Sequence, residues 1–131
     1  MAKIIMVLLV EPFEEPRLVA VEDTLDNLHN LVEGYLQAIY PWDDPVALVC
    51  DENAIRNGKM PNRVLEDKNG RVYDVIWGTF FICGLGKHDF ASINDRLAEK
   101  YTEKFRWPEI IMKTNGHLVM LREDLGARVI V

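Results

Sequence analysis

Short runs of apolar, often β-branched residues dominate this chain, and Gly, Pro, Asn or Asp follows most of them within two residues. Runs of this length between turn-forming residues are typical of strands, whereas a helix needs a longer stretch with apolar residues three or four apart. Residues 3–10 and 17–22, joined by a segment with two prolines, predict an N-terminal hairpin. Further strands are expected at residues 35–40, 46–50, 72–76, 79–83, 118–122 and 128–131.

Two segments have the period of a helix instead. The first is expected to begin after Thr24, because a threonine side chain can accept a hydrogen bond from the first turn, and to close at Gly34. The second runs to about Phe105, and either Asp89 or Ser92 could be its N-cap. The apolar stripes are Leu25, Leu28, Leu31 and Val32 in the first helix, and Ile93, Leu97, Tyr101 and Phe105 in the second.

The connections are turns rather than long crossovers. Asp67-Lys-Asn-Gly70 and Asn115-Gly116 indicate hairpins, because Asn-Gly supplies two positions that accept a positive φ. Residues 51–64 have the composition of an irregular polar segment, and residues 109–112 that of a short strand or a turn. Because strands outnumber helices and turns separate them, we expect an α+β fold with a mostly antiparallel sheet and two main helices, forming a single domain over residues 1–131.

Charge restricts the partners that such a domain can bind. The chain has 15 basic and 21 acidic residues and a formal net charge of -6, which argues against direct, non-specific nucleic-acid binding. The imbalance lies in residues 1–66, with 5 basic and 12 acidic side chains, against 10 and 9 in residues 67–131. An acidic first half is usually a solvated surface, and the alternative is a docking face for a basic partner.

The cysteines and the N-terminus indicate the compartment. Cys50 and Cys83 both lie in apolar runs, which favours two buried free thiols in a reducing cytoplasm over a disulfide between adjacent strands. The N-terminal apolar run is short and lacks a small-residue cleavage site. No stretch approaches the length of about 18 apolar residues that a membrane span needs. We therefore expect a cytoplasmic protein without a membrane partner.

The motifs of metal sites and nucleophilic enzymes do not occur in the sequence. His29, His88 and His117 lie far apart, without the spacing of metal ligands, so no metal and no cofactor are expected. Ser92 is the only serine and is not within a Gly-x-Ser-x-Gly motif. The nearest approach to a phosphate-binding loop is Gly84-Leu-Gly86-Lys87, expected as a loop before the second helix. Its alternative interpretation is a plain strand-to-helix turn.

One region combines aromatic, amide, acidic and basic side chains. Aromatic faces with Asn, Asp and Arg close by are what a pocket for a base or a ribose uses, through stacking and edge hydrogen bonds. Each residue also has a structural explanation, as part of the core edge or of a local turn. The predicted ligand-binding residues are Tyr40, Trp42, Asp43, Asn62, Arg63, Tyr73 and, for a second phosphate contact, Lys87.

Several segments together resemble a known family. Gly34-Tyr35, Tyr40-Pro41, residues 46–50, Pro61-Asn-Arg63 and residues 73–82 carry the resemblance, and the most specific piece is Gly78-Thr-Phe-Phe with its upstream Tyr-Asp. The chain resembles, over roughly residues 3–122, an uncharacterised family of small phage and mobile-element proteins known only as a domain of unknown function. Members more often carry Phe after Tyr-Pro, where this chain has Trp42. The resemblance implies a genetic setting, as an accessory protein of a phage, plasmid or integrated element in a bacterial cytoplasm, and it supplies no catalytic residues to carry over.

These observations support two functional hypotheses before any other. The first is a non-enzymatic accessory protein that binds and sequesters a small nucleotide-like ligand, with a possible counter-defence role, as a homo-oligomer. The second is an acidic interaction module, or a nucleic-acid mimic, that acts on a host protein. Sequestration by accessory proteins of such elements is an analogy and not a result of residue chemistry.

A small enzyme is the third and weakest hypothesis. Asp43, Asp44, Asp74 or His88 would then supply the acid and the base, since paired carboxylates can separate their pKa values. Adjacent aspartates in a loop are more often solvated turn residues, so the sequence favours binding over catalysis.

Overall fold

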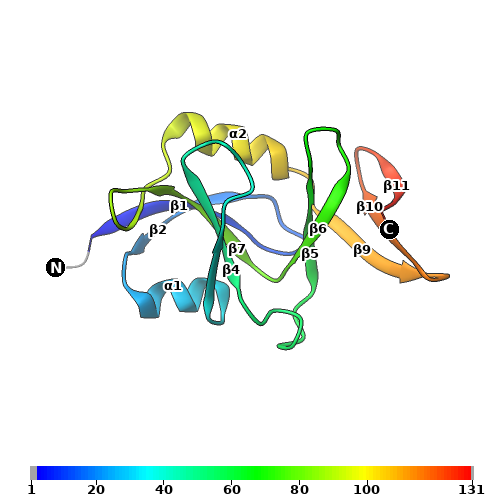
Figure 1. Cartoon of the computed structure of the whole chain (residues 1–131), viewed down its shortest axis with the longest axis horizontal. Coiled ribbons are helices and arrows are strands. Elements are labelled where there is room, and N and C mark those ends of the chain that lie inside the picture. Colours follow the sequence, from blue (N-terminus) through cyan, green and yellow to red (C-terminus); the bar gives the residue numbers. More distant parts are fainter. Residues whose placement is uncertain (1–2, 131) are drawn as a thin grey trace.

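The computed structural model describes residues 3–130 and has the sheet-rich α+β fold that the sequence predicts. The main sheet is antiparallel, with the strand order β2-β1-β7-β4-β3, and β8 pairs with the end of β7. One helix lies on each side of it, α1 on one and α2 on the other (Figure 1). This layer comprises β1 (Ile4–Val10), β2 (Arg17–Glu22), α1 (Leu25–Val32), β3 (Leu36–Ile39), β4 (Val46–Asp51), β7 (Phe80–Leu85), β8 (Phe90–Ala91) and α2 (Asp95–Phe105).

Two smaller antiparallel sheets complete the described residues. A hairpin of β5 (Pro61–Glu66) and β6 (Val72–Trp77) stands beside the main sheet. It is followed in space by the sheet of β9 (Glu109–Thr114), β10 (His117–Arg122) and β11 (Gly126–Val129), which we call the C-terminal sheet. The C-terminal sheet lies at the end of the molecule opposite the start of β1 (Figure 1).

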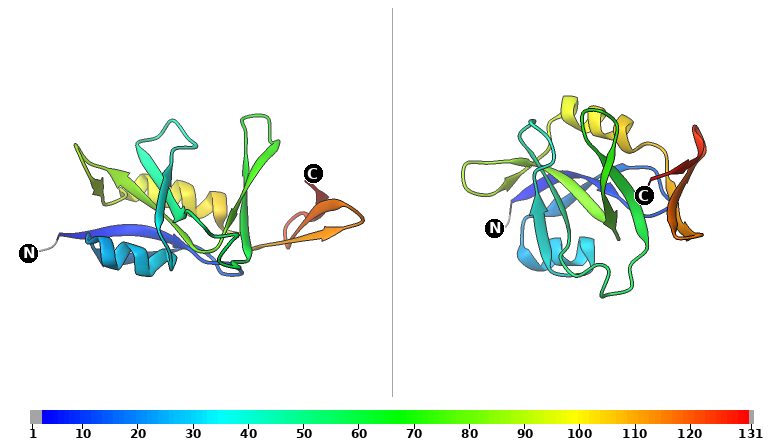
Figure 2. Two further views of the ribbon diagram at one scale, coloured as in Figure 1. Left: turned by 60° about the horizontal axis from the view of Figure 1, so that its bottom comes forward. Right: turned by 45° about the vertical axis from the view of Figure 1, so that its right-hand side comes forward.

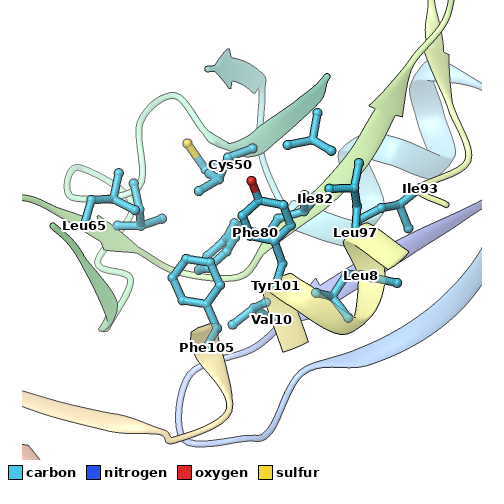
Figure 3. Close-up of a cluster of buried hydrophobic side chains, with 14 residues drawn as sticks. Leu8, Val10, Cys50, Leu65, Phe80, Ile82, Ile93, Leu97, Tyr101 and Phe105 are labelled. Atoms are coloured by element: carbon cyan, nitrogen blue, oxygen red, sulfur yellow. The ribbon is translucent and has the colours of Figure 1, made fainter. Parts of the chain in front are cut away.

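The main sheet has a hydrophobic core on both faces. All six residues of β4 are buried, and side chains alternate between the two faces along each strand. Phe80 therefore packs on the α2 side and Phe81 on the α1 side. Figure 3 shows Leu97, Tyr101 and Phe105 extending from α2 into the first of these clusters. A sheet covered on both faces explains why its central strands are almost continuously apolar in sequence.

The first helix begins as predicted but ends differently. The hydroxyl of Thr24 accepts a hydrogen bond from the backbone N–H of Asn27 at 3.2 Å, which is an N-cap. Glu33, and not Gly34, adopts the left-handed conformation after the last turn, with φ 55. Gly34 is required by space instead, because a Cβ there would lie 2.4 Å from the carboxyl group of Asp51.

The second helix is capped by a residue that the sequence analysis did not select. The side chain of Asn94 accepts a hydrogen bond from the N–H of Leu97 at 2.8 Å, so the prediction of Asp89 or Ser92 is wrong. The hydroxyl of Ser92 accepts a hydrogen bond from the N–H of Met6 at 2.9 Å and so joins this segment to β1. The second helix begins later than predicted because Phe90 and Ala91, which follow Asp89, form β8.

The predicted loop at residues 84–86 is also corrected. Gly84 and Leu85 belong to β7 and pair with Ala91 and Phe90 of β8. Lys87 therefore lies in a hairpin turn, not before a helix. These residues therefore form neither a phosphate-binding loop before a helix nor the alternative strand-to-helix turn, because β8 lies between them and α2.

The predicted irregular segment at residues 51–64 is wrong in its last part. Pro61–Glu66 forms β5, and its first five residues are buried although two of them are polar. The region 109–112, left open between strand and turn, is part of β9. Asn115 and Gly116 form the predicted turn, with φ 50 and 80. The last predicted strand, 128–131, appears as β11, and Val131 lies outside the described residues.

Both cysteines are free and buried. They lie on opposite faces of the main sheet, Cys50 in the α2 cluster and Cys83 in the α1 cluster, so the alternative of a disulfide between them is excluded. Burial raises the pKa of Cys50 to about 11 and that of Cys83 to about 12, so both remain protonated at neutral pH. Neither helix in the described part of the chain has the length and the apolar character that crossing a membrane requires.

Candidate functional site

A cavity of about 470 Å³ lies between the β3–β4 loop, the β5–β6 turn and α2. The loop and the turn project to the same side of the molecule as α2 (Figure 2). A volume of this size is in the range of small-molecule sites. Its lining consists of two aromatic side chains, three lysines and four carboxylates, together with Pro41. These residues are Trp42, Tyr73, Lys68, Lys100, Lys104, Asp43, Asp44, Glu66 and Asp67.

Trp42 is held at this cavity by the aromatic side chains of α2. Its ring centroid is 4.4 Å from that of Tyr101 and 5.9 Å from that of Phe105. Tyr101 and Phe105 are one helical turn apart and point from α2 toward the sheet (Figure 3). Trp42 therefore sits on a rigid aromatic base although it belongs to a loop, and the cavity retains one wall of fixed position.

Asp44 fastens the same loop to α2. One carboxylate oxygen, Oδ2, accepts hydrogen bonds from the Lys100 ammonium and from the Tyr101 hydroxyl, each at 2.6 Å. The hydrogen bond from Lys100, followed by that from Tyr101, holds the pKa of Asp44 below its usual range. Burial, and then the hydrogen bond to Asp44, raises the pKa of Tyr101. Asp44 is therefore a carboxylate and Tyr101 a neutral donor at neutral pH.

This arrangement predicts a pH-dependent contribution to stability. The native pKa of Asp44 is below the usual value of 3.8, so the ionised carboxylate stabilises the fold above that pH, and this stabilisation is lost as the pH falls through the native pKa. We expect Asp44→Asn to lower the free energy of unfolding at pH 7, and the difference from the natural chain to shrink below pH 4. Urea unfolding at pH 7, 5 and 3 measures it.

Asp43→Asn is the matched control for this prediction. The Asp43 side chain is 99% exposed and reaches only Lys68, at 3.9 Å, so its loss should change stability little at any pH. A difference between Asp44→Asn and the natural chain that stays constant from pH 7 to pH 3 would contradict the role of the Asp44 charge.

The charges around the cavity are nearly balanced but unevenly placed. Glu66 forms an ion pair at 3.2 Å with Arg128, which does not line the cavity. The carboxylate of Asp67 accepts hydrogen bonds from the backbone N–H groups of Asn69 and Arg71 in its own turn. The positive charge on the helix side comes from Lys100 and Lys104, which are four residues apart on α2. An anionic ligand group is therefore favoured along α2, and the carboxylates lie toward the two turns.

Trp42, Asp43 and Tyr73 are the predicted site residues that the structure brings together. They line the same cavity from the β3–β4 loop and from β6. Tyr40 and Lys87 are near each other but elsewhere, at a cavity of about 390 Å³ beside the β7–β8 turn. The predicted cluster is thus divided between two surfaces.

Asn62 and Arg63, also predicted as ligand-binding residues, do not reach either surface, because both are fully buried in β5. The guanidinium of Arg63 donates to the carbonyl oxygens of Phe105, at 3.0 and 3.2 Å, and of Glu14, at 2.6 Å, and to the side chain of Asn62 at 2.8 Å. The Asn62 amide in turn donates to the carbonyl oxygens of Val10 and Gly78, each at 2.9 Å. Burial lowers the pKa of Arg63 to about 10. Both residues hold the fold together.

The acid and base candidates of the enzyme hypothesis do not meet in one place. Asp43 and Asp44 line the cavity at Trp42, Asp74 lines a separate cavity of about 340 Å³, and His88 lies at the β7–β8 turn. Asp44 is also occupied by two donors. Within residues 3–130, no group of three or more His, Cys, Asp or Glu side chains is placed to hold a metal ion.

Sequence reasoning missed Lys100 and Lys104. A signal for them exists, because Arg96, Lys100 and Lys104 are four residues apart and so form one basic stripe along α2. That stripe borders the apolar stripe of Leu97, Tyr101 and Phe105, which the sequence analysis did identify. The sequence does not show that the β3–β4 loop lies beside this basic stripe.

Comparison with known proteins gives one family. A family model described as Domain of unknown function (DUF3846) matches residues 4–106, which include the main sheet, both helices and the β5–β6 hairpin. The expectation of an uncharacterised family is confirmed by this match. Comparison with curated proteins and with solved structures gave no match.

Proposed function

The chain belongs to the DUF3846 family, for which no activity is described, and on that premise we propose that it binds a small nucleotide-like ligand at the cavity beside Trp42 without transforming it. One observation carries the proposal: two aromatic side chains and two lysines of one helix line a cavity of about 470 Å³. Aromatic side chains on which a base can stack, together with cations for a phosphate, are what such a ligand needs.

The geometry suggests an orientation for the ligand. Trp42 is fixed against Tyr101, so a base stacking beside it would lose little of its affinity to ordering the loop. Tyr73, from β6, is exposed and lines the same cavity, so it is free to approach the same base. Lys104 makes no ion pair within the described residues, and Lys100 shares its charge with Asp44. The phosphate is therefore placed along α2, at Lys104 first.

We further propose that binding serves sequestration, in the cytoplasm of a bacterium that carries a phage or another mobile element, as the sequence resemblance suggests. The separation of Asp43 and Asp44 from Asp74 and His88 favours a ligand that is held rather than converted. Effective sequestration requires a dissociation constant on the order of 1 nM, or about -12 kcal/mol. The proposal therefore predicts tight binding and not a weak metabolite contact.

The test is a thermal-shift screen of the purified protein with nucleotides, including cyclic dinucleotides and ADP-ribose derivatives, followed by calorimetry on any ligand found. A ligand present at 100 times its dissociation constant adds about 2.7 kcal/mol of stability. We expect Trp42→Ala to weaken binding about 5- to 150-fold, because stacking on an aromatic side chain is worth about 1–3 kcal/mol per base. Lys104→Ala should also weaken binding, and more so for ligands whose phosphate groups carry more negative charge.

The control variants separate the cavity from the rest of the surface. Tyr40→Ala removes an exposed aromatic side chain at the other cavity and should leave affinity unchanged. Circular dichroism checks that Trp42→Ala keeps its fold, and Lys104→Ala needs no repacking because the side chain is exposed. No shift with any nucleotide, or equal affinity for Trp42→Ala, Lys104→Ala and the natural chain, would refute this assignment. A protein partner would then be the better proposal.

A further inference from the structure

The C-terminal sheet has apolar side chains on both of its faces. Ile111 and Met120 are paired across β9 and β10, and they pack inward with Val64 of the β5–β6 hairpin. Because neighbours along a strand point to opposite faces, the residues on either side of these two point outward. The outer face consists of Ile110, Met112, Val119, Leu121, Ala127 and Val129, which the pairing of β9, β10 and β11 places side by side.

Nothing within the described residues covers this outer face. Ile110 is 47% exposed, Met112 43% and Val129 63%. An antiparallel sheet with one face in water normally alternates apolar and polar residues, whereas continuous apolar strands are typical of sheets covered on both sides. β4 shows the covered case in this same molecule, with all six residues buried. The C-terminal sheet therefore has the sequence of a covered sheet and lacks its cover.

The two ends of the outer face differ in chemistry. At one end lies a groove of about 480 Å³, lined by Phe13, Pro108, Ile110 and Leu121 together with Arg122 and Glu123. Arg122 is paired with Asp124 at 2.7 Å, so the carboxylate of Glu123 is the unpaired charge there within the described residues. At the other end, beside the turn at Asn115, Met112 and His117 lie on the same outer face. One end is therefore an apolar groove with an acid, and the other has an apolar side chain and an imidazole.

We propose that this outer face is the interface of a homodimer, with a second copy of the chain as its cover. A two-fold axis that crosses the strands reverses their direction, so the groove of each copy receives the Met112 end of the other. Methionine is flexible enough to fill an irregular apolar groove. The same rotation brings His117 of each copy to Glu123 of its partner, and every contact occurs twice.

The size of the face sets the strength that we expect. Strands of six, six and four residues, about 4.8 Å apart and rising about 3.3 Å per residue, present roughly 250 Å² per copy. Two copies would therefore bury roughly 500 Å² of this sheet face, which is below the range of about 1,200–2,000 Å² of stable specific interfaces. We therefore expect a weak, reversible dimer rather than an obligate one.

Sedimentation velocity of the full chain without ligand, from about 1 to 500 μM, tests the proposal. We expect a concentration-dependent equilibrium between monomer and dimer, and at least a tenfold higher dissociation constant for Met112→Glu. Ile55→Glu is the matched control, because Ile55 is 69% exposed outside the C-terminal sheet and should not affect dimerisation. A chain that stays monomeric throughout, or a dimer that persists in Met112→Glu, would overturn the proposal.

A charge exchange at the two ends tests the orientation. His117→Glu places an acid against Glu123 of the partner, and Glu123→Lys replaces the hydrogen-bond acceptor opposite His117 by a cation. Each change alone should weaken the dimer, and the two together should restore it. If the losses of dimer affinity in the two single variants add in the double variant, the two-fold arrangement is excluded. The readout needs no nucleotide, so its failure leaves the proposal for the cavity at Trp42 standing, and the reverse holds too.

Discussion

Arg63→Ala is expected to lower the free energy of unfolding by about 3–5 kcal/mol, because it leaves a cavity and several unpaired carbonyl groups inside the protein. Arg63 is fully buried and donates to the carbonyl oxygens of Phe105 and Glu14 and to the side chain of Asn62. These partners come from the end of α2, the β1–β2 turn and β5, so the loss is not confined to one element. Urea unfolding followed by tryptophan fluorescence measures it.

Two further variants make this prediction specific. Arg63→Lys retains the charge but cannot direct donors to three partners at once, so we expect a smaller loss than for alanine. Arg17→Ala removes an exposed arginine paired with Glu11 at 3.0 Å, and should cost less than about 1 kcal/mol. A loss for Arg63→Ala no larger than that for Arg17→Ala would show that the buried hydrogen bonds do not stabilise the fold as described.

A loss of similar size, about 3–5 kcal/mol, is expected for Phe81→Ala. Phe81 is fully buried at the centre of the main sheet, where β7 pairs with both β1 and β4. It packs on the α1 side, away from Trp42, so the folded fraction should keep its affinity for a ligand at the cavity. Thermal unfolding should show a melting temperature lower by on the order of 10–20 °C.

Phe81→Leu retains most of the buried volume and should cost clearly less than the alanine variant. Ile55→Ala is the surface control, because an exposed side chain away from special features contributes within about 0.5 kcal/mol. If Phe81→Ala cost no more than Ile55→Ala, the placement of Phe81 in the core would be contradicted.

The parts of the fold that could be predicted depend on neighbours in sequence. β2 has the predicted bounds Arg17–Glu22, and Thr24 caps α1, because alternation and capping are decided within a few residues. The predicted strand at residues 79–83 contains the adjacent residues Phe80 and Phe81, and they lie in the two core clusters on opposite faces of the sheet, as side-chain alternation along a strand requires. Local periodicity was sufficient for all of these.

Residues 61–66 could not be predicted in this way. Pro61, Asn62 and Arg63 have the local composition of a loop, and nothing nearby indicates that they are buried. Their hydrogen-bond partners Val10 and Phe105 are 52 and 42 residues away. A buried polar strand is stable only because these distant carbonyl groups meet it, and that information lies in the tertiary structure.

The candidate site was predicted in part for the same reason. Trp42 and Tyr73 were selected by residue type, and the structure places both at one cavity. Tyr40 is only two residues before Trp42 but lies at a different surface, near Lys87. Lys87 is in the β7–β8 turn because β7 extends through Leu85. Residue type suggested which side chains could bind a ligand, but only the course of the chain in space decides which of them line the same cavity.

The position of β7 between β1 and β4 has a consequence for how the chain folds. β1 is complete at residue 10 and β4 at residue 51, but their common neighbour begins only at Phe80. Until β7 has been synthesised, β1 and β4 each keep an apolar edge without hydrogen-bond partners, and such edges can pair with other chains. Closure then depends on contacts of long sequence separation, which slow folding. The nascent chain is therefore most exposed to aggregation before its middle strand emerges.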